Sequence, residues 1–184
     1  MIKQTVTSVV AFLYLFIFAT CAYAGEGFDY KSTDGRLIVW VPMKPQVSER
    51  ELPSTTGSPY RQITIASETS QAVFLAGILD FRKGFSTKAD EMSYLDSMLS
   101  SLKQGFGKNF VLDKNDGSKD LVSSTGQKGR QIKGTVDGQQ LIIRAYIGKY
   151  SIYMQQATFP ITNITSLKNA ERFFDSLVIT DSVK

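Results

Sequence analysis

The chain has 184 residues, with 21 basic and 17 acidic side chains, one cysteine and no histidine. Without histidine it lacks the commonest general base and the most usual metal ligand, and no serine–histidine or cysteine–histidine dyad is available. We therefore expect no catalytic residues, no resident metal and no cofactor.

Residues 1–24 have the pattern of a secretory signal peptide. Lys3 gives a positive start, Val9–Ala19 is an apolar run, and Ala22-Tyr23-Ala24 has the small-x-small form of a cleavage site. The run is shorter than the roughly 20 residues that cross a bilayer. The pattern predicts cleavage before Gly25, export to the periplasm or out of the cell, and no membrane span in the mature protein.

The only cysteine leaves a second interpretation open. Phe18-Ala19-Thr20-Cys21 loosely matches a bacterial lipobox, whose cysteine is lipidated. The alternative to a cleaved, unanchored protein is therefore an envelope lipoprotein anchored at Cys21. With cleavage before Gly25, the mature chain has no cysteine and hence no disulfide, thiol nucleophile or thiolate metal site.

Residues 25–184 suit a single domain, which we expect to be monomeric. A domain of about 150 residues buries roughly 70% of the surface that its unfolded chain exposes, so it needs no cross-link. The basic residues are scattered, and the short group Lys128, Arg130 and Lys133 is typical of a solvated strand face. Nucleic-acid binding would need a denser basic stripe with stacking aromatics, so it is not expected.

The mature segment begins with patterns typical of strands. Phe28–Ser32 and Arg36–Val41 are predicted strands, separated by an Asp-Gly dipeptide that favours a hairpin. Prolines end the second strand, and Lys44–Pro59 is predicted to be a long polar loop of the kind that often carries binding residues. Further strands are predicted at 60–66 and 72–81, where a buried helix is the alternative for the second segment.

Two helices are predicted from apolar residues at helical spacing. The first spans Thr87–Gln104, with Ser86 or Thr87 as its cap, and the second spans about Ser166–Leu177. The first apolar stripe consists of Met92, Leu95, Met98, Leu99 and Leu102, and the second of Leu167, Ala170, Phe173, Phe174 and Leu177. Strands are predicted between the helices at 110–113, 121–124 and 129–136. This order favours an α+β fold with a central antiparallel sheet flanked by helices, an α/β/α sandwich.

Leu141–Thr158 is the stretch around which this fold is organised. Two runs rich in β-branched and aromatic residues flank Gly148-Lys149, which predicts a hairpin with a type II′ turn. Both faces of the two strands carry large side chains, so we expect the hairpin to be central and covered on both sides.

Two short motifs have spacings close to those of known catalytic or metal sites. Ser100 and Lys103 have the Ser-x-x-Lys spacing of penicillin-binding enzymes, but the partner motifs of that family are absent. The oxygen-rich segment from Asp113 to Asp120 has glycine at the fifth position, whereas a calcium loop of the EF-hand type requires it at the sixth. Both are therefore interpreted as ordinary surface segments.

Several structural motifs resemble one known group. They are Leu37–Pro42 followed by Met43-Lys44-Pro45, then Gly129-Arg130-Gln131, the strand Leu141–Tyr150 with Arg144, and the ending Arg172–Leu177. Together they are similar to bacterial exported proteins of the PsbP-like α/β/α sandwich superfamily, which includes PsbP, a eukaryotic Ran-binding protein and DcrB-type envelope lipoproteins. The resemblance implies the sandwich fold and members that act by binding, with no shared catalytic residues.

The function expected from these observations is that of an exported, non-enzymatic accessory or binding protein, with an unknown protein or small ligand as its partner. A secreted hydrolase built on carboxylates is the alternative. The candidate binding surface consists of Arg144, Tyr146, Tyr150 and Tyr153 together with the loop Lys44–Pro59, because arginine and tyrosine are enriched at interface hot spots. Tyrosines packed under a helix are the competing interpretation.

Overall fold

A computed structural model describes residues 27–53, 59–81, 88–115 and 117–180, and of residues 88–91 it describes the backbone alone. The expected signal peptide, Cys21 and the expected helix cap at Ser86 or Thr87 lie outside these residues. In the part of the chain that is described, no helix is long and apolar enough to cross a membrane.

The centre of the molecule is an eight-stranded sheet in which neighbouring strands are antiparallel. Its order is β3-β4-β5-β10-β9-β8-β6, and β7 pairs with β8 beside β6. The strands are β3 (Gln46–Leu52), β4 (Tyr60–Glu68), β5 (Val73–Phe81), β6 (Val111–Leu112), β7 (Ser118–Val122), β8 (Lys128–Val136), β9 (Gln139–Ile147) and β10 (Ser151–Pro160).

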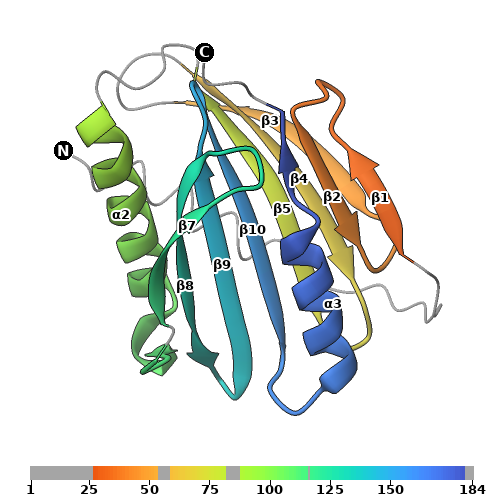
Figure 1. Cartoon of the computed structure of the whole chain (residues 1–184). Coiled ribbons are helices and arrows are strands. Elements are labelled where there is room, and N and C mark those ends of the chain that lie inside the picture. Colours follow the sequence, from red (N-terminus) through yellow and green to blue (C-terminus); the bar gives the residue numbers. More distant parts are fainter. Residues whose placement is uncertain (1–26, 54–58, 82–87, 116, 181–184) are drawn as a thin grey trace.

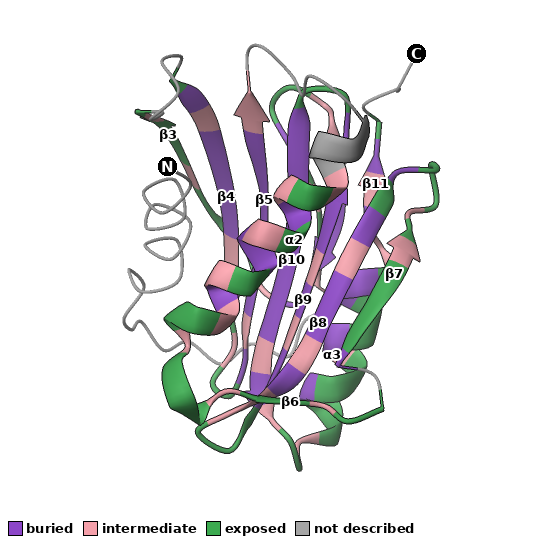
Figure 2. Ribbon diagram, turned by 90° about the vertical axis from the view of Figure 1, so that its left-hand side faces the viewer, coloured by how far each residue is buried: buried purple, intermediate pink, exposed green. Residues whose placement is uncertain are grey.

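The two faces of this sheet have different covers. Helix α2 (Lys88–Gly105) crosses one face and is followed by a 3₁₀ turn at Gly107–Asn109, as the view onto that face shows (Figure 2). The other face carries helix α3 (Ile164–Asp175) and a small antiparallel sheet (Figure 1). The small sheet has the order β1-β2-β11, with β1 (Phe28–Lys31), β2 (Leu37–Val41) and β11 (Val178–Ile179).

The period-two alternation of the strands divides the buried side chains into two cores. The α2-side core contains the helix stripe Leu95, Met98, Leu99 and Leu102 packed on Ile132, Leu141, Ile143 and Ile152. The α3-side core joins Ala170, Phe173 and Phe174 of the helix to Val39 and Val41 of the small sheet and to Ile63, Ile65, Phe74 and Ile78 of the large sheet. Each fully buried side chain of this kind contributes roughly 1.5–3 kcal/mol to folding.

The predicted α+β class and most predicted elements are confirmed, including Val73–Phe81 as a strand rather than a helix. Helix α3 begins earlier than expected, at Ile164, because Asn163 is its N-cap: its side-chain oxygen accepts a hydrogen bond from the Ser166 amide at 2.8 Å. Leu167, which was expected on the buried stripe, is 41% exposed.

The central hairpin is confirmed, but its turn is not the predicted one. Ile147 pairs with Ile152, and the amide of Gly148 donates to the carbonyl of Ser151 at 2.8 Å, so the turn residues are Lys149 and Tyr150. Each β10 residue therefore faces a β9 residue two positions from the expected one. Because a shift of two residues preserves the pleat, every side chain keeps its expected face.

The predicted loop Lys44–Pro59 is wrong in its first half. Gln46–Leu52 forms β3, the edge strand, which pairs along its whole length with β4. Polar and charged residues dominate this strand because its side chains are mostly exposed, and charged side chains are a common feature of edge strands. Residues 54–58 lie outside the described part of the chain.

Candidate functional site

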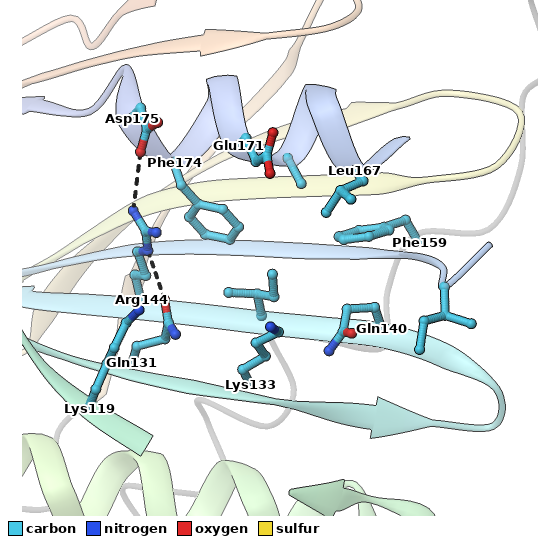
Figure 3. Close-up of a pocket in the computed structure, with 13 residues that line it drawn as sticks. Lys119, Gln131, Lys133, Gln140, Arg144, Phe159, Leu167, Glu171, Phe174 and Asp175 are labelled. Atoms are coloured by element: carbon cyan, nitrogen blue, oxygen red, sulfur yellow. Dashed lines mark hydrogen bonds and ion pairs between the residues drawn. The ribbon is translucent and has the colours of Figure 1, made fainter. Parts of the chain in front are cut away.

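A groove with a volume of about 510 Å³ lies between α3 and the β7–β9 part of the large sheet. Its volume is within the 300–1,000 Å³ typical of small-molecule sites. One wall is the side of α3 that faces away from the small sheet, and the floor is the adjoining surface of the strands (Figure 3). The lining residues are Lys119, Gln131, Lys133, Gln140, Ile142, Arg144, Phe159, Ile161, Leu167, Ala170, Glu171, Phe174 and Asp175.

A row of polar side chains crosses the floor at one end of the groove. Lys119 pairs with Gln131, Gln131 with Arg144 and Arg144 with Gln155, on four neighbouring strands. Cross-strand partners share a face, so the row runs from the β7 edge to a position under α3. At its inner end the amide nitrogen of Gln155 donates to the carbonyl of Phe173 at 2.6 Å.

Arg144 is the centre of this polar end. Its Nε donates to the side-chain oxygen of Gln131 at 3.0 Å, and its guanidinium lies 4.7 Å from the centroid of the Phe174 ring. Its Nη1 is 3.7 Å from a carboxylate oxygen of Asp175, whose side chain is 78% exposed. An ion pair of that length with so exposed a partner contributes little to stability. The hydrogen bond and the aromatic ring therefore orient the guanidinium, and its charge is only weakly neutralised.

Burial affects the ionisation of the neighbouring tyrosine. Tyr146 is 4% exposed, and burial raises the pKa of its hydroxyl, an effect that the adjacent Arg144 opposes and the charge of Asp175 reinforces. Tyr146 is therefore a neutral, packed residue beside the groove and supplies no charge to it.

The opposite end of the groove is apolar. Phe159 and Leu167 lie there, next to the side chain of Gln140 (Figure 3), and Ile161 also lines the groove. The amide nitrogen of Gln140 donates to the carbonyl of Gly134 at 2.7 Å, which ties this side chain to the sheet. The two ends of the groove thus differ in chemistry.

The four predicted binding residues are not brought together. Arg144 lines the groove. Tyr146 and Tyr153 are 4% and 0% exposed and belong to the α3-side core, in line with the competing interpretation that the tyrosines are packed under a helix. Tyr150 is exposed at the hairpin turn, where Lys149 lies over its ring. Of the Lys44–Pro59 segment, the described strand β3 is at the far edge of the sheet, because β4, β5 and β10 separate it from β9.

The other polar lining residues were missed from the sequence. The three basic residues of β8 do not share a face: Arg130 contacts Asp96 of α2 and Asp120 of β7, whereas Lys133 reaches Asp113 at 3.5 Å and lines the groove. These residues could have been recognised in the sequence as polar side chains at strand positions that the two-residue period assigns to a covered face. Gln131 and Arg144 both meet that criterion, since Arg144 lies between Ile142 and Tyr146 on its side of β9.

The lining combines hydrogen-bond donors with apolar surface. Lysine, arginine and glutamine donate hydrogen bonds, and the aromatic and aliphatic residues offer apolar contact. Among the described residues, no group of three or more acidic, histidine or cysteine side chains is placed to hold a metal ion. Glu171 and Asp175 are one helical turn apart on the α3 wall and both are exposed.

A comparison of the sequence with protein-family models finds no match, and a comparison with curated proteins finds none either. The residues of the groove are therefore interpreted from their own geometry.

Proposed function

We propose that residues 25–184 form an exported, non-enzymatic binding protein of the bacterial envelope or secretome, which holds its ligand in the groove beside α3. The observation that carries this proposal is the polar row Lys119–Gln131–Arg144 on the floor of a hollow of ligand size. Charged residues are rarely placed on a covered sheet face unless they are paired or have a role.

The groove favours binding over catalysis because most of its polar side chains, those of lysine, arginine and glutamine, are hydrogen-bond donors, and its described lining pairs no nucleophile with a base. A carboxylate-based hydrolase would use Glu171 and Asp175, the two acidic lining residues. A screen of ester, amide and glycoside substrates tests this alternative. Reproducible turnover that is lost in Glu171→Gln or Asp175→Asn would replace binding by hydrolysis.

Two further parts of the proposal concern export and fold family. The sequence pattern of residues 1–24 supports export, and the layer order α2, large sheet, then α3 with the small sheet is compatible with membership of the PsbP-like group. Mass spectrometry of the mature N-terminus distinguishes a free Gly25 from the alternative, a diacylglycerol-modified Cys21 that anchors the protein as a lipoprotein.

A groove-blocking experiment tests the binding function. Cys21 is the only cysteine of the sequence, so a chain that starts at Gly25 accepts a single engineered thiol. Glu171→Cys places a bulky maleimide label in the groove, and Thr165→Cys places the same label on an exposed position of α3 outside it. Native mass spectrometry then records which molecules from an envelope extract stay bound.

We expect a bound species with the unlabelled protein and with the label at Thr165→Cys, and its loss with the label at Glu171→Cys. Equal melting temperatures of the two labelled proteins control for folding. A bound species that survives the label in the groove would place the binding site elsewhere.

A further inference from the structure

The polarity of the groove changes along its length. Gln140, Ile142 and Arg144 lie on one side of β9 at alternate positions, so the floor extends about 14 Å between the first and the last. Arg144, Gln131 and Lys119 form the polar end. Phe159 and Leu167 lie at the apolar end, and Lys133 and Glu171 lie in the middle (Figure 3). Ile161, which directly follows β10, is also in the lining, and Ile142 lies between Gln140 and Arg144 on β9.

From this gradient we infer that the ligand is an amphipathic anion, a molecule with a carboxylate or phosphate head and an acyl or alkyl tail. The head lies at Arg144 and Lys119, and the tail lies along Ile142 towards Phe159 and Leu167. The inference rests on the proposed binding function and adds the class and the orientation of the ligand.

The head is assigned to the Arg144 end by charge. Three cationic side chains line the groove, Lys119, Lys133 and Arg144, and all three stand on its floor. The planar guanidinium matches the geometry of a carboxylate or phosphate, and such charge-assisted hydrogen bonds are among the strongest in proteins. Asp175 is the only acidic residue close to Arg144 in the lining, and its exposed carboxylate at 3.7 Å competes weakly with an incoming anion.

The tail is assigned to the other end by exposed apolar surface. Ile161 and Leu167 line the groove and are 59% and 41% exposed, and Ile164, the first residue of α3, is 70% exposed. Large apolar side chains that cluster on a surface commonly mark a contact site, whereas single ones are unremarkable. A tail laid on Ile161 and Leu167 would remove this surface from water.

The test measures binding of simple amphiphiles to the chain from Gly25, below the concentration at which each forms micelles. Isothermal titration compares dodecanoate, dodecyl phosphate and dodecyltrimethylammonium, and a series from octanoate to dodecanoate. We expect the two anions to bind and the cation not to bind. Affinity should rise roughly fourfold per added CH₂ until the apolar end is filled. The preferred anion distinguishes a carboxylate head from a phosphate head.

Substitutions at the two ends test the orientation. Arg144→Gln should weaken dodecanoate binding by about tenfold or more, since hydrogen bonds to charged groups are lost. Asp175→Asn should strengthen it by about two- to fivefold, because a competing carboxylate is removed. The matched control Lys149→Gln removes an exposed cation at the hairpin turn and should change nothing.

The apolar end has its own pair of variants. Leu167→Ser should weaken dodecanoate binding several-fold and have a smaller effect on octanoate, whose tail does not extend as far. Val122→Ser removes a more exposed apolar side chain on β7, 71% exposed and outside the groove, and should leave both affinities unchanged.

Three results would overturn the inference: equal affinity for the anionic and cationic amphiphiles, unchanged affinity in both Arg144→Gln and Asp175→Asn, or no binding of either anion. Dodecanoate binding that survives the maleimide label at Glu171→Cys would also overturn it. These results would leave the proposed binding function standing if another species from the envelope extract, such as an acidic peptide, binds the unlabelled protein and is lost with the label at Glu171→Cys.

Discussion

The α3-side face of the large sheet has two halves, and the arginine in each half has different ionic partners. Over β4, β5 and β10 the small sheet closes the face, and Arg36 contacts Asp80 at 2.6 Å and the Ser151 hydroxyl at 2.8 Å. Over β7–β9 helix α3 lies beside the strands, and among the described residues the nearest carboxylate to Arg144 is that of Asp175, 3.7 Å away. Figure 1 shows both halves in one view.

The two arginines have the same side-chain exposure, 22%, but their acidic partners do not: Asp80 is 26% exposed and Asp175 is 78% exposed. Burial alone would lower the pKa of the Arg36 guanidinium, but its hydrogen bonds to Asp80 and Asp34 raise it. In the closed half, under the small sheet, the charge of Arg36 is therefore paired with the carboxylates of Asp34 and Asp80. In the open half, the ion pair of Arg144 with Asp175 is long and its carboxylate is exposed, which is the basis of the proposed ligand contact.

The largest effect should come from the residue that joins the two halves. Phe173 is fully buried, and its ring lies 5.5 Å from that of Phe74 and 5.2 Å from that of Phe174. Phe173→Ala should lower the free energy of unfolding by about 3–5 kcal/mol in chemical denaturation. Phe28→Ala, at a position 45% exposed in β1, should lower it by less than about 1 kcal/mol. Similar losses of stability in the two variants would mean that Phe173 is not packed in the α3-side core.

The same substitution in both halves sharpens the comparison. Arg36→Met leaves the carboxylate of Asp80 without its main partner and should lower the free energy of unfolding by about 1–3 kcal/mol. Arg144→Met breaks a long ion pair with an exposed carboxylate and should lower it by at most about 1 kcal/mol. Denaturant titration of both variants measures the difference. An equal or reversed order would contradict the division into a closed and an open half.

The wall of the groove depends on the cap of α3. Asn163→Ala removes the hydrogen bond to the Ser166 amide and should lower the free energy of unfolding by about 1 kcal/mol. Asn163→Asp keeps an accepting oxygen and serves as the control. Thermal melting of the two variants tests this, and equal melting temperatures would show that the cap is not needed.

The smallest expected effect is a dependence of stability on acid in the closed half. Burial would raise the pKa of Asp34, but hydrogen bonds from Ser32 and Arg36 and the charge of Arg36 outweigh it, so the pKa lies below its ordinary value of 3.8. A carboxyl whose pKa is lower in the folded state stabilises the fold above pH 3.8, and this contribution is lost as the pH falls through the folded value.

Asp34→Asn should therefore lose less stability than the wild-type protein between neutral pH and pH 3, measured by denaturant titration at a series of pH values. A steeper acid loss in the variant would show that the ion contacts of Asp34 do not lower its pKa.

The sequence by itself determined most elements and the faces of most side chains, with the polar edge strand β3 and the exposed Leu167 as exceptions. Alternation of apolar residues fixed the strands, and the helical spacing of Leu95, Leu99 and Leu102 fixed the buried side of α2, because both signals depend on residues close in the chain. The Asp137-Gly138 turn was also readable, since both residues have the positive φ that this dipeptide tolerates.

Only the tertiary structure decided which elements cover each face of the strands. Register in the Leu141–Thr158 hairpin shifted by two residues because pairing of β10 with β5 as well as β9 outweighs the local turn preference. Tyr146 and Tyr153 are buried because α3 and the small sheet return to this face from both ends of the chain. The polar end of the groove forms because the strand register places Lys119, Gln131 and Arg144 in one row of the sheet. Pairing between strands is a long-range property that local patterns do not encode.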